Sequence, residues 1–276
     1  MYMGALKALI SFYTIFHMNI TQEDMDAMES RFYLTPLVGI VFGFLVLLVV
    51  VAMDLLSLKF GFGSSMALAA LVLLTVYAGS KFLHFDGLTD FGDGMIVSGE
   101  QSDHIRALKD TLVGAGGIGV ALITVLCSFA FYSMTGQLYA LLIFPVIEVM
   151  VKNAMVVAAS FGKPGNGMAA RQVARTTPGS AAIGMVISLI ASCILLGVVV
   201  LVFYLLTGEV MYIRESVAIV IVGLIVSTIV GLVMARTANR VFGMVNGDIL
   251  GATNEVSRPF LAFFLCLTVT IISTVI

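Results

Sequence analysis

The chain has 276 residues, 60% of them hydrophobic and only 11% charged, with a formal net charge of −2 and a mean hydropathy of +1.11. A soluble domain does not need this much apolar surface, so the composition indicates a polytopic membrane protein. The net charge says nothing about nucleic acid, but no basic patch is dense enough to bind it, so we expect no nucleic-acid partner. The three cysteines lie far apart inside apolar runs, without the spacing of a metal-thiolate site or a disulfide framework.

Residues 1–20 are apolar with a single lysine, Lys7, as a signal peptide would be. They lack a small-residue cleavage site, however, and run directly into the acidic segment 22–29. We therefore expect a retained N-terminal helix that is amphipathic or partly inserted in the membrane.

Seven stretches are long and apolar enough to be predicted as membrane-spanning helices. They are residues 34–53, 66–83, 114–134, 138–160, 181–206, 217–234 and 259–276. No internal repeat of fixed period and no low-complexity linker interrupts them. The predicted fold is therefore an all-α, polytopic membrane helix bundle in which residues 1–276 form a single membrane-embedded domain.

The lysines and arginines between these spans indicate how the chain is oriented. Ten lie in the connections predicted for one side of the membrane: Lys7, Arg31, Arg106, Lys109, Lys163, Arg171, Arg175, Arg236, Arg240 and Arg258. Only two, Lys59 and Arg214, lie in the connections on the other side. Because basic residues are retained in the cytoplasm, the first set is predicted to be the cytoplasmic face of a cell-membrane protein.

Residues 84–94, HFDGLTDFGDG, carry Asp86, Asp90 and Asp93 directly after the second predicted span. On a helix these positions lie within about 60° of one another, at about 100° per residue. Like charges at that spacing repel unless a cation lies between them, and Mg²⁺ prefers carboxylate oxygens together with substrate phosphates. The alternative is a solvated turn, but such a turn does not need its acids at helical spacing.

Other cytoplasmic segments carry candidates for contacts with a phosphate. Arg106 and Lys109 lie three residues apart, and Arg171 belongs to a later basic segment that positive-inside orientation would also explain. Asp110 is a candidate metal ligand from a second helix. The four glycines that follow it indicate either close helix packing or a phosphate cradle.

The fourth predicted span contains Glu148, Lys152 and Asn153. Glu148 and Lys152 have the i, i+4 spacing of an ion pair within one helix. Ionisable groups inside a membrane face a bundle interior or a cavity. Contact with a ligand and a purely structural pairing are therefore both open interpretations.

A second acidic face is predicted near the C-terminus, in residues 244–259. Asp248 and Glu255 are seven residues apart and so share a helix face, with Asn246 close by. Two acidic faces on one side of the membrane, with arginines around them, favour a site for a metal and a diphosphate.

Three motifs, HFDGLTDFGDG, KDTLVGAGG and NGDILGATNE, together resemble the cobalamin-5′-phosphate synthase family, also called adenosylcobinamide-GDP ribazoletransferase. That family carries H-x-D-G-L-x-D-x-x-D-G after a membrane span, then D-S-x-x-G-x-x-G, and G-D-x-L-G-A-x-x-E near the C-terminus. These patterns correspond to residues 84–94, 110–117 and 247–255, with Thr111 in place of the usual serine. The resemblance extends over nearly the whole chain.

The resemblance implies a phosphotransferase-type enzyme of the last steps in assembling the nucleotide loop of cobalamin (vitamin B12). Adenosylcobinamide-GDP is expected to react with α-ribazole or its 5′-phosphate and to release GMP, with Mg²⁺ as the required cofactor. These small molecules and membrane lipids are the expected partners, and a homo-oligomer is left open.

The resemblance and the residues together assign roles to individual side chains. The expected metal ligands are Asp86, Asp90, Asp93, Asp110 and Asp248. A carboxylate not fully committed to the metal, Asp93 or Glu255, is expected to take the proton of the attacking hydroxyl. The expected substrate and phosphate contacts are Arg106, Lys109, Lys152, Asn153, Arg171 and Asn246.

Two other functions compete with this one. A CDP-alcohol phosphotransferase also places aspartates on membrane-helix faces, but its pattern has an Ala-Arg pair where this chain has Leu88 and Thr89. A transporter for a cation or an organic solute should spread its acids through the depth of the membrane. Here all the candidate acids except Glu148 are predicted to lie at one face.

Overall fold

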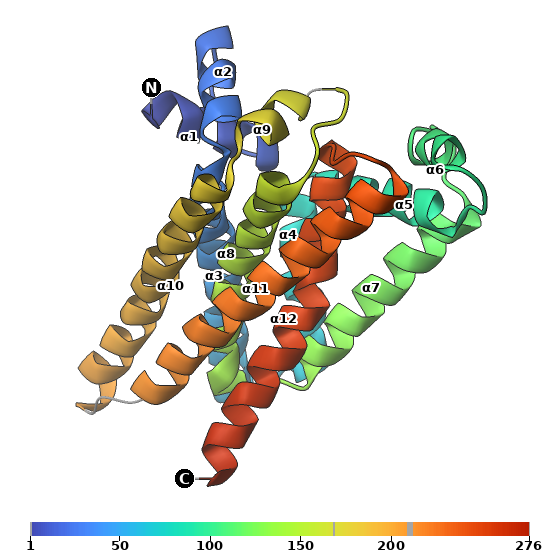
Figure 1. Cartoon of the computed structure of the whole chain (residues 1–276). Helices are drawn as coiled ribbons and strands as arrows, with labels where there is room; N and C mark the ends of the chain where they lie inside the picture. The colour runs from blue at the N-terminus through green and yellow to red at the C-terminus, as the bar shows by residue number, and fades with distance from the viewer. Residues whose placement is uncertain (1, 168, 209–211, 276) are drawn as a thin grey trace.

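The computed structural model describes residues 2–167, 169–208 and 212–275, and these residues form helices with no β-strand beyond one isolated bridge (Figure 1). The elements are α1 Tyr2–Tyr13, α2 Gln22–Ser30, η1 Phe32–Leu34, α3 Pro36–Phe60, α4 Ser65–Gly79, α5 Leu83–Ile96, α6 Gln101–Leu108, α7 Ala115–Ser133, α8 Gln137–Phe161, α9 Ala170–Arg175, α10 Pro178–Thr207, α11 Ile213–Val241 and α12 Gly247–Val275.

Six helices in the described part of the chain are long and apolar enough to cross a membrane: α3, α7, α8, α10, α11 and α12. A seventh span is obtained only if α4 and α5 are counted together, and these two helices meet at an angle of 93°. The prediction of an all-α polytopic bundle with about seven spans is thus confirmed.

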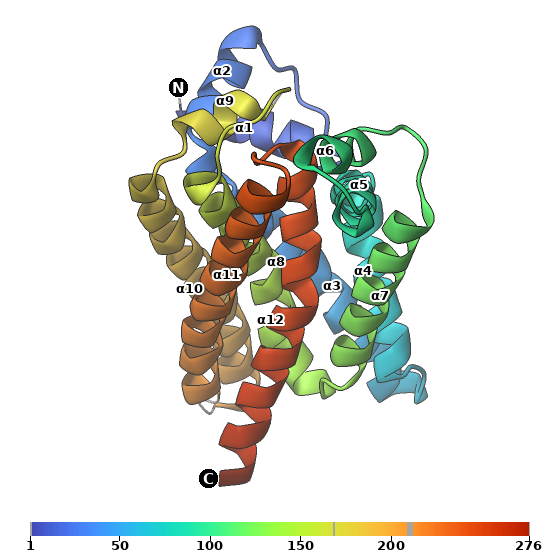
Figure 2. The ribbon, with the colours of Figure 1, turned by 45° about the vertical axis from the view of Figure 1, so that its right-hand side comes forward.

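The second predicted span, residues 66–83, is shorter than expected. Helix α4 ends at Gly79 and has 15 residues, which is about 22 Å of helix at 1.5 Å per residue. The chain then turns through Lys81 and Phe82, whose φ angles of 55° and 56° lie in the left-handed region. Helix α5 therefore runs across the end of the bundle instead of continuing α4 (Figure 2).

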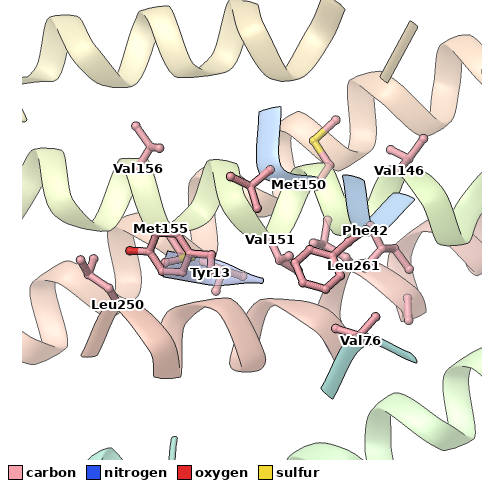
Figure 3. Close-up of a cluster of buried hydrophobic side chains, with 14 of the residues drawn as sticks. Tyr13, Phe42, Val76, Val146, Met150, Val151, Met155, Val156, Leu250 and Leu261 are labelled. Carbon is pink, nitrogen blue, oxygen red and sulfur yellow. The ribbon is translucent and has the colours of Figure 1, made fainter. Parts of the chain in front are cut away.

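Helix α8 is the centre of the bundle, and its most apolar stretch is entirely buried. It packs against α3, α10, α11 and α12. Figure 3 shows Val151 and Met155 of α8 in one buried cluster with Phe42 of α3 and Leu261 of α12. Helix α3 approaches closely because Gly39 has no side chain: a Cβ there would lie 2.6 Å from a backbone oxygen of α8.

The short helices α1, α2, α6 and α9 gather at the same end of the bundle as α5 (Figures 1 and 2). The predicted N-terminal helix is present as α1, which buries Ala8 and Leu9 against the bundle and exposes Met3. This end of the bundle carries most of the polar side chains discussed below.

The boundary of the last polar segment was predicted wrongly. Residues 235–258 were expected outside the membrane, but α11 runs to Val241 and α12 begins at Gly247. Only residues 242–246 connect the two helices. Asn254 and Arg258 of α12 are instead buried in the bundle, where they contact Lys152 and Glu148 of α8. Arg258 is 0% exposed and therefore does not belong to a cytoplasmic connection. Nine basic residues remain on the predicted cytoplasmic side, and two lie on the other side.

Candidate active site

A cavity of about 380 Å³ lies at the end of the bundle where α5, α1 and the start of α12 meet. We call it the polar cavity. Its polar side chains are His84, Asp86, Lys109, Asn166, Gln172, Asn246 and Asp248. These side chains come from segments far apart in sequence, so only the folded chain forms this site.

Glycines allow α5 and α12 to come together. A Cβ on Gly87 would lie 2.6 Å from the backbone oxygen of Asp248, and one on Gly251 would lie 3.3 Å from His84. Gly87 therefore permits a backbone approach that a side chain would prevent, and Gly251 leaves room for a second close contact. This contact places the aspartates of α5 beside Asp248 of α12.

The carboxylates of Asp86, Asp90 and Asp248 form what we call the acidic face. Helix α5 is continuous from Leu83 to Ile96, so the predicted helical spacing of its aspartates is confirmed. Burial raises the pKa of Asp90 to about 7, and the nearby charges of Asp248 and Asp86 add to the rise. No lysine or arginine of the described residues forms an ion pair with any of the three. A bound cation would relieve this repulsion.

The donor set fits Mg²⁺ bound together with a substrate. In the described part of the chain, no three histidine, cysteine, aspartate or glutamate side chains converge closely enough to form a complete metal site. Mg²⁺ seldom needs such a set, because it keeps several waters and takes one or two carboxylates plus substrate phosphates. Asp86 and Asp248 both line the polar cavity and offer those two carboxylates from two helices.

The other two predicted metal ligands lie elsewhere. Asp93 accepts hydrogen bonds from the backbone N–H groups of Gly114 (2.7 Å) and Gly117 (2.8 Å), so it caps the N-terminus of α7. Asp110 is exposed and accepts a hydrogen bond from the backbone N–H of Leu112 in its own loop. Neither side chain lines the polar cavity.

The predicted phosphate contacts divide into two groups. Lys109 and Asn246 line the polar cavity, and Asn246 also donates to Asp248 at 2.7 Å and accepts from the backbone of Ile249. Arg106 and Arg171 do not line it. Arg106 pairs with an aspartate on its own helix, and Arg171 pairs with acids of α2.

Glu148, Lys152, Glu255 and Arg258 are almost completely buried in the bundle, and we call these four side chains the buried network. Arg258 forms an ion pair with Glu148 and lies 3.5 Å from a carboxylate oxygen of Glu255. Two glutamates, one lysine and one arginine balance in charge. The predicted pairing of Glu148 with Lys152 is replaced by the pair with Arg258, which comes from a different helix.

The buried network reaches the polar cavity through His84. The Lys152 ammonium donates to Asn254 Oδ1 at 2.8 Å and contacts His84 Nε2 at 2.7 Å. An ammonium group can only donate, so His84 Nε2 is the acceptor and its ring hydrogen is on Nδ1. Lys152 thus lies beneath the cavity wall, whereas its neighbour Asn153 donates to Ser227 of α11 at 2.9 Å and stabilises helix packing.

Glu255 lies deeper than a cytoplasmic acidic face would place it. It is 1% exposed, accepts a hydrogen bond from Asn254 at 2.8 Å, and follows Asp248 by seven residues, or about 10 Å of helix. It belongs to the buried network and not to the acidic face.

His84 and Tyr13 are site residues that the sequence did not single out. His84 is 2% exposed and stacks on Tyr13 of α1, with ring centroids 5.3 Å apart. The usable signal was the place of His84 on α5 opposite Asp86, which turns the ring toward the bundle interior.

The fold and the polar cavity define a polytopic membrane protein whose site for charged small molecules lies at one end of a helix bundle. The sequence model of the family described as cobalamin-5-phosphate synthase matches residues 5–267. The chain therefore belongs to this family, and it is an enzyme of the transferase class.

Several relatives named adenosylcobinamide-GDP ribazoletransferase align over most of both chains. The protein of Methanocella arvoryzae is 31% identical over 93% of this chain and 92% of its own. The protein of Methanosarcina mazei is 27% identical, covering 93% and 89%, and that of Fusobacterium nucleatum is 24% identical, covering 92% and 94%. No solved structure gives a significant match.

Proposed function

We propose that this enzyme joins adenosylcobinamide-GDP to α-ribazole, or to its 5′-phosphate, in a Mg²⁺-dependent reaction. A ribose hydroxyl oxygen attacks the phosphorus that carries the cobinamide, and a new P–O bond forms. The bond from that phosphorus to the bridging oxygen of the diphosphate breaks, and the electron pair leaves with GMP. The hydroxyl proton passes to a carboxylate.

The observation that supports this proposal most strongly is the composition of the polar cavity. Asp86 of α5 and Asp248 of α12 both line this cavity, and so does Lys109. When Mg²⁺ is bound, it supplies positive charge to the diphosphate and the departing GMP. Lys109 adds a second positive charge, and Asn246 holds Asp248 in place through its amide.

The proton acceptor is best sought on the acidic face. Asp93 is held by two backbone N–H groups, and Glu255 is buried beside Arg258. Asp86 and Asp90 have no hydrogen-bond donor to release before they accept a proton, and Asp86 is exposed to the cavity. One of these two carboxylates therefore suits the role of base better than the two first predicted.

We further propose that the polar cavity faces the cytoplasm. The bias of nine basic residues against two supports this orientation. The diphosphate of adenosylcobinamide-GDP is charged, so a cavity on the cytoplasmic side would receive this substrate without transport.

A direct assay tests the proposal. The purified protein in lipid vesicles would be incubated with adenosylcobinamide-GDP, Mg²⁺ and either α-ribazole or its 5′-phosphate, and both cobamide and GMP would be measured. We expect equal amounts of the two products, and none after EDTA. GMP without cobamide would indicate hydrolysis only, and no product with either acceptor under any metal condition would refute the proposal.

A further inference from the structure

A second cavity, of about 470 Å³, lies between α5 and α7 and shares Asp86 with the polar cavity. We call it the lateral groove. Its other side chains include Phe82, Phe85 and Thr89 at α5, and Ile118, Leu122 and Val125 on α7. Because Ile118 and Leu122 are more than half exposed on a membrane-spanning helix, this groove opens on the side of the bundle that faces lipid.

The lateral groove and the polar cavity differ in charge. No lysine, arginine or histidine lines the lateral groove, and Asp86 is its only charged residue. A diphosphate or a phosphate buried in it would have no positive partner. The polar cavity, in contrast, contains Lys109. The groove therefore suits an uncharged group, and only at its Asp86 end can it accept hydrogen bonds from a hydroxyl.

Aromatic rings form one wall of the groove. The Phe82 ring stacks on Tyr77 with centroids 5.8 Å apart and an interplanar angle of 11°, and it meets Phe85 edge-on at 6.1 Å. Phe82 is 50% exposed, although its φ of 56° is a conformation that costs energy for any residue with a side chain. The strained turn at the start of α5 thus presents an aromatic face toward the groove.

We propose that the lateral groove binds the aromatic base of α-ribazole, and that Asp86 receives its ribose hydroxyls where the two cavities meet. This inference rests on the proposed function and adds to it the place of the acceptor. The diphosphate of the other substrate then occupies the polar cavity, on the far side of Asp86. Offset or edge-on ring contacts favour an aromatic ligand over an aliphatic one.

The competing occupant is a lipid acyl chain. It would fill the apolar part of the groove but offer no hydrogen-bond donor to the carboxylate of Asp86 at the end of the groove. An aromatic nucleoside places an apolar ring and a hydroxylated sugar at the two matching ends. The chemistry of the whole groove therefore favours the nucleoside.

The test uses the full-length protein in lipid vesicles and measures the KM of each substrate separately. In Leu122→Trp, the larger side chain occupies the groove, and we expect KM for α-ribazole to rise about tenfold. KM for adenosylcobinamide-GDP should stay within about twofold. The matched control is Ile123→Trp, since Ile123 is the next residue on α7, is 64% exposed and does not line the groove; both KM values should stay unchanged.

A second variant, which changes the groove wall at another position, distinguishes a loss of binding from misfolding of the first variant. Phe82→Ala removes a ring from the wall and should also raise KM for α-ribazole selectively. Free benzimidazole serves as the probe of the site: it should compete with α-ribazole but not with adenosylcobinamide-GDP, and Leu122→Trp should abolish this inhibition.

The outcomes separate the two proposals. If both variants keep the normal KM for α-ribazole and change activity only with the lipid composition, the groove holds an acyl chain and the inference is wrong. If the unmodified enzyme makes no cobamide from either acceptor, the proposed function itself fails, whatever binds in the groove.

Discussion

The acidic face and the buried network contain the same types of side chain in opposite situations. The acidic face has three carboxylates, one of them with a pKa raised to about 7, and no lysine or arginine in the described part of the chain forms an ion pair with it. The buried network has two carboxylates and two cations, all almost fully excluded from solvent. The acids of the buried network are neutralised from within the chain, whereas those of the acidic face depend on a charge from outside.

This difference separates residues that act on a ligand from residues that hold the bundle. An unbalanced cluster beside a cavity costs folding energy and is useful only when a cation binds. A balanced, hydrogen-bonded cluster in the interior fixes which helices pack together, and breaking it leaves a buried charge. The predictions below test this assignment, beginning with the largest expected effect.

Removing a carboxylate from the acidic face should reduce activity and leave stability unchanged. Asp86→Asn keeps the shape of the side chain but removes its charge, and we expect kcat to fall by about 10³-fold or more, as when a key electrostatic group is lost. Thermal unfolding of the variant should be unchanged. Asp110→Asn is the control on an exposed loop and should retain activity within about threefold; an Asp86→Asn enzyme of normal activity would contradict the role given to this face.

Removing a charge from the buried network should lower the free energy of unfolding. Arg258→Met removes the ion-pair partner of Glu148 and Glu255 and leaves the network with one negative charge in excess. We expect a loss of about 3 kcal/mol in the free energy of unfolding, because a buried charge is left unpaired. Chemical denaturation in mild detergent measures this. Adding Glu148→Gln to the same chain should restore part of the loss. Equal stability of the Arg258→Met and unmodified proteins would show that the pair is not needed for folding.

The contact between α5 and α12 should be sensitive to a single methyl group. Gly87→Ala places a Cβ 2.6 Å from the backbone of Asp248, so the two helices must separate, at a cost of about 1–3 kcal/mol for overpacking. We expect lower kcat and weaker Mg²⁺ activation together. Gly119→Ala is the matched control, since a Cβ at Gly119 on α7 meets no atom within 4 Å. Similar activity of both variants would contradict the proposed close approach.

The smallest effect should come from the lysine of the polar cavity. Lys109→Met removes a charge that faces the diphosphate, and we expect KM for adenosylcobinamide-GDP to rise about tenfold at unchanged stability. Arg106→Met lies three residues away and should change KM by less than about twofold, because Arg106 pairs with Asp103 on the surface. The reverse order of effects would place the phosphate site nearer α6.

Local patterns were enough to predict part of this architecture. Helical spacing depends only on the residues themselves, so the helical spacing of the α5 aspartates could be read from the sequence and is confirmed by the continuous helix. Apolar runs likewise predicted the number of spans. The same reasoning failed where a helix changes direction, since hydropathy gives no sign that Lys81 and Phe82 take left-handed angles.

Partners distant in sequence could not be predicted. Glu148 and Arg258 are 110 residues apart, and Asp93 lies 24 residues from Gly117 of the helix it caps. A hydropathy average treats each charge as solvated, so it placed Arg258 and Glu255 outside the membrane although their partners allow burial. The spacing of Asp248 and Glu255 was read correctly as one helix face, but depth along α12 divides them between two environments.

The 93° turn from α4 into α5 also affects the route by which the acceptor would reach this enzyme and the concentration that the enzyme would meet. It places Asp86 at the boundary between the polar cavity and the lateral groove, which opens on the lipid-facing side of the bundle. A nucleoside that partitions into the bilayer would then reach the enzyme by diffusion in two dimensions. Its effective concentration would be a mole fraction in lipid, and adding empty vesicles would dilute the acceptor without changing the volume of water.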